Sequence, residues 1–449
     1  MKKFLISAIL ALAAFCAVSA QDFKTGYFLD NYSYSYRLNP AAPMDGDTYT
    51  FFGLGLGNVS VELNSNFPTT TLISTGKDGE YLMPFLNTAQ FSDEDILSKL
   101  TDRNNLTLDA NINVLTFGRQ AEDHRFSVEL NLRTGLDIGA TKDFFTFARR
   151  GLSSLSSGDY NGTYQFDNIG MDLSTYGELA FCYSQKIGDI VTVGGGVKAL
   201  VGLANANANW SALAREGAVE DVYAKSDATI QMALPLDFTV PTGTYDGGTF
   251  FDLNSLYGQL GSIDLKSIGK TLAGFGAAVD LGVTVEPVEG LSISASVLDL
   301  GFISWNSTVN ATTSFEGEFD GDDFSRVFTI KEPGGKNYLK MLNYTAHAGV
   351  KYRMPFYDGL SVGALGTFQK NNKEGRLGID FTPFKFFSLA ASGGYGTYGP
   401  SFGAAINLRA PFFNLFAGMD GIVTKFAPKS FIPDTKVATL ATVGLLITI

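Results

Sequence analysis

Alternation of apolar and polar residues is the feature that most constrains how this chain can fold. In residues 106–114 every second side chain is apolar, with Thr, Asp and Asn between, and 125–137, 172–185 and 436–449 repeat the pattern. A period of two places successive side chains on opposite faces of a β-strand. Many such segments exceed the roughly five or six residues typical of globular strands, and they reach the roughly nine to eleven that a tilted strand needs to cross a membrane. A soluble sandwich also alternates, so the length of the strands is what favours a membrane barrel.

The connections between these segments are of two kinds. Short ones carry Pro or Gly, as in 286–290 and 354–358, and are typical of turns. Long polar ones cover 64–105, 138–171, 204–271, 305–342 and 422–435. If both termini lie in the periplasm, every long connection faces outward and these short turns face inward, which is the arrangement of outer-membrane barrels. The predicted strands are 48–63, 106–117, 125–137, 172–185, 190–203, 272–286, 290–304, 343–353, 359–370, 375–382, 386–396, 400–409, 412–421 and 436–449.

This makes the chain an all-β transmembrane antiparallel β-barrel of about fourteen strands, an even number as bacterial barrels require. Twelve or sixteen strands are the alternatives, and residues 227–240 form either an extra strand or a hairpin above the membrane. Two patches in the long connections predict short helices. Ser92-Asp93-Glu94-Asp95 begins the first with a capping-box pattern, and Asp143–Leu155 is the second.

The first twenty residues have the form of a secretory signal peptide. Lys2 and Lys3 precede an apolar core at 4–18, and the small residues at 17–20 place cleavage after Ala20. For the alternative, a membrane anchor, the core is too short. Cleavage would remove Cys16 and leave Cys182, so no intramolecular disulfide is expected. It would also take the formal net charge from −12 to −14, and such an acidic exported chain is not expected to bind nucleic acid.

Four stretches carry ordered motifs: GYFLD at 26–30 with NYSYSYRLNPA after it, and the stretches at 274–305, 352–365 and 381–403. Together they resemble a Bacteroidota-type family of outer-membrane barrels whose function is unassigned. That family is similar in turn to FadL-type fatty-acid transporters and to the shuttle barrel of the type IX secretion system. The resemblance implies fourteen strands and an N-terminal hatch inside the barrel that carries an Asn-Pro-Ala motif.

The residues that the resemblance assigns to the hatch are also suited to a polar lumen. Tyrosine hydroxyls and an arginine can hydrogen-bond there, and a proline suits the end of a strand rather than the middle of a sheet. The alternative is an ordinary wall strand with tyrosines at the membrane interface. The predicted division is a signal peptide at 1–20, a hatch segment at 21–47 and the barrel at 48–449. The predicted hatch and ligand-binding residues are Tyr32, Tyr34, Tyr36, Arg37, Asn39, Pro40 and Ala41.

Candidates for enzyme chemistry are few. His347 shares the polar face of its strand with Lys351 and Arg353, and a lone histidine there is more often a plain wall residue than a catalytic base. With two histidines and one remaining thiol, no metal cluster of nitrogen or sulfur ligands and no cofactor are expected. The acidic loop Asp320–Asp323 is interpreted as solvated, with a Ca²⁺ site as the alternative.

Two glycine-rich stretches are interpreted as relief of crowding inside the barrel. They are Gly53-x-Gly55-x-Gly57 and Gly194-Gly195-Gly196, and for the second a bend or opening in the wall is the alternative. An apolar pocket near the hatch would draw on Phe51, Phe52, Leu54 and Leu56, some of which must face lipid.

The sequence therefore predicts a non-enzymatic barrel in the cell outer membrane. Its expected function is FadL-like passage of a hydrophobic or amphipathic small molecule. The alternative is an interaction or structural barrel that serves protein secretion or surface assembly. Expected partners are outer-membrane lipid and a hydrophobic small-molecule ligand, together with envelope proteins under the alternative.

Overall fold

The structure of the chain, a computed structural model, describes most of its residues. The predicted signal peptide and the acidic loop at 320–323 lie outside them. The described residues are 23–30, 32–44, 47–76, 78–151, 155, 162–216, 222–234, 242–245, 248–251, 272–307, 309–319, 337–421, 425–430 and 432–449.

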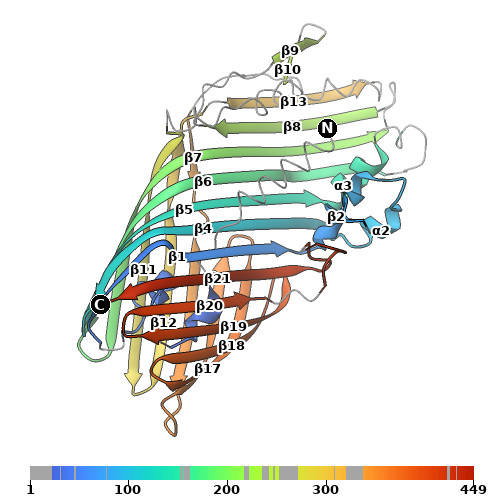
Figure 1. Cartoon of the computed structure of the whole chain (residues 1–449). Helices are drawn as coiled ribbons and strands as arrows, with labels where there is room; N and C mark the ends of the chain where they lie inside the picture. Colours follow the sequence, from blue (N-terminus) through green and yellow to red (C-terminus); the bar gives the residue numbers. More distant parts are fainter. Residues whose placement is uncertain are drawn as a thin grey trace.

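Antiparallel strands form a closed barrel, and the prediction of fourteen wall strands is confirmed (Figure 1). The barrel closes because β1 pairs with β21 on one side and with β4 on the other, so that Val59 lies opposite both Val443 and Ile112. In order around the barrel the wall strands are β1 (Tyr49–Ser65), β4 (Arg103–Gln120), β5 (His124–Thr141), β6 (Tyr164–Ile187), β7 (Val191–Glu216), β11 (Gly274–Val288), β12 (Leu291–Trp305), β15 (Thr345–Arg353), β16 (Leu360–Gln369), β17 (Lys373–Phe384), β18 (Phe387–Gly396), β19 (Gly399–Ala410), β20 (Phe413–Asp420) and β21 (Val437–Thr448).

The wall has an apolar outer face and a polar inner face. On β6, Leu179 and Phe181 are 53% and 45% exposed, whereas Glu178 and Ser184, on the opposite face of the same strand, are fully buried. Large apolar side chains exposed in this way would be unfavourable in water and suit contact with hydrocarbon. The same exposure recurs around the wall at Phe117, Leu130, Val197, Phe275, Leu281, Leu377, Phe402, Val443 and Leu445.

One side of the barrel extends well beyond the rest, which corrects the prediction of a loop at 204–271. Residues 204–216 continue β7, and β8 (Val222–Ala233) pairs with this continuation. A further strand, β13 (Val309–Phe319), pairs with β8, and Figure 1 shows β4 to β8 and β13 side by side in one sheet. The predicted extra strand at 227–240 is thus β8 in part, and its residues 235–240 lie outside the described chain. Three short strands lie in the connections after β8 and β13: β9 (Thr242–Tyr245) and β10 (Gly248–Phe251) pair with each other, and β14 (Tyr338–Met341) pairs with the end of β12.

Short elements at the loop end of the barrel form a compact cap. Both predicted helices are present, as α2 (Asp93–Leu97), whose Ser92 and Asp95 complete the capping box, and α3 (Lys142–Arg150). Arg149 of α3 donates hydrogen bonds to Asp93 (2.7 Å) and to the backbone carbonyls of Pro84 and Phe91. One arginine thus joins two connections that are distant in sequence. The cap also holds η3 (Thr69–Thr71), η4 (Pro84–Leu86), β2 (Ser74–Thr75) and β3 (Tyr81–Leu82).

Among the described residues, no helix combines the length and the apolar character needed to span a membrane.

Candidate functional site

The N-terminal segment, residues 23–43, lies against the inner face of the wall (dark blue in Figure 1). It contains two short 3-10 helices, η1 (Lys24–Tyr27) and η2 (Ser35–Arg37). Tyr32, Tyr34 and Tyr36 are 7%, 0% and 4% exposed. The alternative that these tyrosines form a wall strand is wrong, because η2 includes part of the stretch and the first wall strand begins at Tyr49.

An aromatic layer forms where the segment meets β1 and β20. The ring of Phe416 lies 5.0 Å from that of Tyr32 and 5.5 Å from that of Tyr34, both in T-shaped geometry, and Phe51 lies 6.2 Å from Tyr36. Edge-to-face pairs of this kind add stabilisation beyond the apolar area they bury. Of the predicted pocket residues, Phe51 belongs to this layer, whereas Leu54 is 71% exposed on the outer face.

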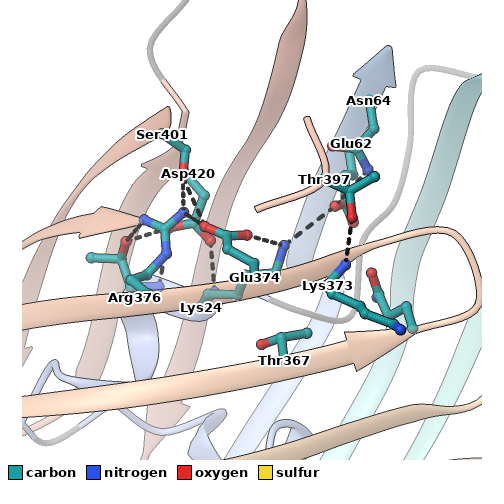
Figure 2. Close-up of polar contacts among 12 residues, drawn as sticks. Lys24, Glu62, Asn64, Thr367, Lys373, Glu374, Arg376, Thr397, Ser401 and Asp420 are labelled. Carbon is teal, nitrogen blue, oxygen red and sulfur yellow. Dashed lines mark hydrogen bonds and ion pairs between the residues drawn. The ribbon is translucent and has the colours of Figure 1, made fainter. Parts of the chain in front are cut away.

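A buried charge cluster holds the first helix of the segment (Figure 2). The Lys24 ammonium lies 3.1 Å from Glu374 and 3.6 Å from Glu62. The Lys24 backbone N–H donates to Asp420 (2.6 Å), and Arg376 lies between Glu374 (2.6 Å) and Asp420 (3.3 Å). Since charges this deeply buried are stable only when paired, the position of Lys24 depends on three wall strands at once.

A second buried cluster holds η2. The Arg37 guanidinium donates two bonds of 3.1 Å from Nε to the Glu129 carboxylate, and its Nη1 donates to Asn58 (2.9 Å). It also lies over the Tyr34 ring, 4.1 Å from the centroid, and Tyr36 donates its hydroxyl hydrogen to Glu129. The sequence suggested that Arg37 hydrogen-bonds in a polar lumen, and the contacts identify Glu129 of the wall as its partner.

The Asn-Pro-Ala motif at 39–41 follows directly and contacts β11, while Leu38 before it contacts β12. Asn39 donates from Nδ2 to Thr284 (3.0 Å) and accepts from the backbone N–H of Ala41 (2.9 Å), which closes a local turn. Ser296 donates to the carbonyl of Leu38 (2.6 Å). The motif therefore ends the segment with its polar atoms satisfied against the wall.

Glycines in the wall leave room for the segment. A Cβ added at Gly194 would lie 2.5 Å from the carbonyl carbon of Pro40, and one at Gly349 would lie 2.5 Å from the Tyr27 ring. Such distances are far inside van der Waals contact, so these positions accept only glycine while the segment is in place. This supports the interpretation of Gly194 as relief of crowding. Glycines in the same relation to the segment are Gly282 at Asn39, Gly378 at Phe28, Gly403 at Thr25 and Gly418 at Phe23.

Two cavities lie at different depths along the barrel. The turn-side cavity, about 120 Å³, lies between the segment and the end of the barrel at which β1 begins, and Tyr27, Tyr32, Leu38, Tyr49 and Arg125 are among its lining residues. The loop-side chamber, about 170 Å³, lies toward the long connections and is lined by wall and loop residues outside the segment. Its lining includes Glu62, Asp109, Arg133, Asp137, Asp172, Trp305, Lys340, Lys370, Asn372 and Tyr398.

The histidine considered for catalysis lies beside the hydroxyl group of a neighbouring wall strand. His347 Nδ1 lies 3.0 Å from the Thr367 hydroxyl, and Ser296, opposite it on β12, directs its own hydroxyl to the carbonyl of Leu38. The loop-side chamber, by contrast, was not predicted as a site. The related feature of the sequence is an acidic residue in each of four successive wall strands, Glu62, Asp109, Asp137 and Asp172.

Comparisons with known proteins found solved structures that are similar to this chain. Three solved structures similar to this chain are the P. putida toluene transporter TodX (9% identity, 91% of this chain and 92% of that chain, TM-score 0.39), the Ralstonia pickettii toluene transporter TbuX (12%, 92% and 92%, 0.40) and a Pseudomonas aeruginosa FadL homologue (10%, 91% and 91%, 0.39). No curated protein sequence matches the chain.

One family model does match, over residues 40–420, which is most of the chain and begins within the Asn-Pro-Ala motif. That model describes a family of unknown function, and the chain therefore belongs to the DUF5723 family.

Proposed function

We propose that this protein is an outer-membrane barrel that passes an amphipathic small molecule, with the N-terminal segment as its hatch. The observation that supports this most is the position of the segment relative to the two cavities. One cavity is lined by the segment and the other lies on its loop side. A solute that moved between them would have to pass the segment.

The contacts of the segment are of a kind that can open and re-form. They are ion pairs and hydrogen bonds from Lys24, Arg37 and Asn39 to the wall, together with aromatic packing. Ordered loops and segments that gate a passage move on microsecond to millisecond timescales, and noncovalent anchors permit such motion.

The linings favour an amphipathic solute over a purely apolar one. Charged side chains line both cavities, for example Asp109 in the chamber and Lys351 in the turn-side cavity, while the layer between them is aromatic. A solute with one polar and one apolar end can exchange contacts with each region in turn.

Uptake by liposomes that contain the purified mature protein tests this proposal. The probes are hexyl glucoside, hexanesulfonate and hexyltrimethylammonium, which share one tail and differ in head charge, with sucrose as the polar control. We expect at least one hexyl probe to enter severalfold faster than into empty liposomes, and sucrose to enter only when residues 22–47 are deleted. Uptake of all three probes at the rate of empty liposomes would contradict the proposal.

A second candidate is an interaction barrel that serves secretion or surface assembly. The observation that favours it is the sheet of β7, β8 and β13, which extends beyond the barrel at the loop end. Co-purification of a defined envelope protein after mild detergent extraction, lost on removal of residues 222–233, would support this candidate, and its retention would contradict it.

A further inference from the structure

A buried arginine without an acidic partner lies at the turn-side cavity. Arg125 of β5 is 4% exposed and is one of the residues that line this cavity. No ion pair joins it to a carboxylate among the residues that the structure describes. Arginine keeps its charge in proteins, and a buried charge is unfavourable unless an opposite charge lies beside it. An anion beside Arg125 would therefore stabilise the protein.

The hydrogen bonds of Arg125 leave two of its nitrogens free. Nη2 donates to the backbone carbonyls of Pro40 (3.4 Å) and Ala42 (3.2 Å). The guanidinium carbon also lies 5.3 Å from the centre of the Tyr36 ring. Nε and Nη1 donate to no group in the described part of the chain, and neither is closed to solvent. An acceptor that enters the cavity can therefore reach them.

The charges that line the cavity leave one positive charge uncompensated. Two cations, Arg125 and Lys351, line it together with one carboxylate, that of Asp30. Lys351 donates to Asp30 and to the backbone carbonyl of Phe28 (2.6 Å), so these two charges compensate each other. The remaining charge is that of Arg125, and it matches a monovalent anion.

The carboxylates nearest to Arg125 along the chain have other partners. Glu129, four residues further on and on the same face of β5, accepts from Nε of Arg37 (3.1 Å). Asp123, in the turn before β5, is exposed and accepts from Gln185 (3.2 Å). Neither of them lies within ion-pair distance of Arg125, so the counter-ion has to come from outside the chain.

The size and the lining of the cavity suit a small oxyanion. A volume of about 120 Å³ has room for several waters or for one small molecule. The hydroxyls of Ser33, Ser35 and Ser292 line it as well, and a hydroxyl can donate to a second oxygen of the anion. Hydrogen bonds from arginine to a carboxylate are stronger than bonds between neutral groups. A short carboxylate therefore combines the single charge and the two acceptor oxygens that the cavity can bind.

We propose that the turn-side cavity binds a small carboxylate, of the size of formate or acetate, which accepts one hydrogen bond from Nε or Nη1 of Arg125 and another from a serine hydroxyl of the lining. Nη2 keeps its bonds to Pro40 and Ala42. The bound anion therefore stabilises the end of the N-terminal segment, residues 38–42, against the wall. This inference goes beyond the proposed function and does not depend on it.

Hydrogen–deuterium exchange of the detergent-solubilised mature protein at neutral pH tests the site. Sodium acetate replaces sodium MOPS, whose anion is too bulky for the cavity, at constant ionic strength, and acetamide is the neutral control of the same size. At about three times the dissociation constant of acetate, exchange at residues 38–42 should slow about fourfold, because the docked segment alone binds the anion. Acetamide should leave the exchange unchanged. Equal exchange in acetate and in MOPS at every concentration would overturn the proposal.

Variants assign the effect to one cation. Arg125→Gln should abolish the acetate effect at residues 38–42. The matched control is Lys385→Gln, which removes an exposed cation from the turn between β17 and β18 and should keep the full effect. A full acetate effect in Arg125→Gln would overturn the proposal. Because Arg125→Gln also removes two bonds to the segment, the comparison of acetate with MOPS in the wild type is the test that stands without it.

A second carboxylate separates the cavity from a general effect of salt. Trimethylacetate carries the same charge as acetate on a larger body, so it should slow exchange at residues 38–42 severalfold less at the same concentration. The acetate effect should also saturate, as binding to one site does. Equal protection by the two carboxylates would overturn the assignment to this cavity.

Discussion

Two layers of the barrel interior differ in the sign of neighbouring charged side chains. In the layer that holds the N-terminal segment, buried charges alternate in sign, as between Arg37 and Glu129, and wall glycines follow the contour of the segment. At the loop-side chamber, like charges face each other across strands, Glu62 opposite Asp109 and Asp137 opposite Asp172. Both layers are built on the same strands.

The two layers therefore differ in how their charges affect stability. Charges that are paired and hydrogen-bonded stabilise one arrangement of the chain, because breaking any one of them leaves a buried charge uncompensated. Like charges directly opposite each other on antiparallel strands destabilise a sheet. The charges of the segment layer thus hold the docked segment, whereas the carboxylates at the chamber oppose each other across the strands.

The largest expected effect breaks the segment layer at Arg37. Arg37→Met leaves Glu129 buried without its cation, which should destabilise the docked segment by about 3–5 kcal/mol. Hydrogen–deuterium exchange of residues 32–42 in the solubilised protein measures this as faster exchange, while the wall strands stay protected. The double variant Arg37→Met/Glu129→Gln should recover part of the loss, because the unpaired charge is gone. Unchanged exchange in the single variant would show that the pair does not hold the segment.

A somewhat smaller effect is expected from filling one wall glycine. Gly282→Ala puts a methyl group into the space of Asn39 and should cost about 1–3 kcal/mol, the range for overpacking of a well-packed core. Exchange at residues 38–42 should rise. The matched control is Gly177→Ala on β6, where nothing lies within 4 Å of the added Cβ, and it should leave exchange there unchanged. Equal behaviour of both variants would contradict the close fit of wall and segment.

The wall was predictable from the sequence because its signals are local. A strand between lipid and a polar lumen must alternate, so segments such as 106–117 and 172–185 predict β4 and β6, and turn residues set the boundaries. The continuation of β7 was missed because residues 204–209 alternate Ala with Asn, and its far end packs beside an aromatic cluster with Phe147, Phe166 and Trp210 instead of lipid. The prediction depends on strands that face lipid and therefore have an apolar outer face. This part of β7 does not face lipid, so it lacks that pattern.

The partners of the candidate site were not predictable, because they depend on register and on distance around the barrel. Arg37 was expected to meet polar wall groups, but nothing local in the sequence identifies Glu129, and Pro40 meets Gly194 across more than a hundred residues. The carboxylates that face each other at the loop-side chamber are also brought together only by the register of the strands. From the sequence alone, each carboxylate is interpreted as an ordinary lumen residue, because the pairing of Glu62 with Asp109 is not known.

A smaller effect of opposite sign sharpens the contrast with the chamber. Asp137→Asn removes one charge opposite Asp172 and keeps an oxygen that can accept from Asn371. We expect a gain of about 0.2–1 kcal/mol in the free energy of unfolding, the size of a cross-strand pair. Denaturant unfolding of wild type and variant in the same detergent measures it. A loss of stability would place this carboxylate with the paired charges of the segment layer.

The smallest expected effect concerns the cap, whose charges lie outside the barrel and meet solvent. The hydrogen bond from Arg149, with a second from Arg150, holds the pKa of Asp93 below its ordinary value. The stabilisation is therefore fully present above the ordinary pKa of an aspartate, about 3.9, and is lost as the pH falls through the lowered value. Hydrogen exchange of α3, corrected for the intrinsic pH dependence of exchange, should accelerate in that acidic range, and Asp93→Asn should remove the acceleration. Residues 32–42 should respond less than α3 over the same range, because the Arg37–Glu129 pair is buried; equal acceleration in both would show that the cap and the segment layer open as one unit.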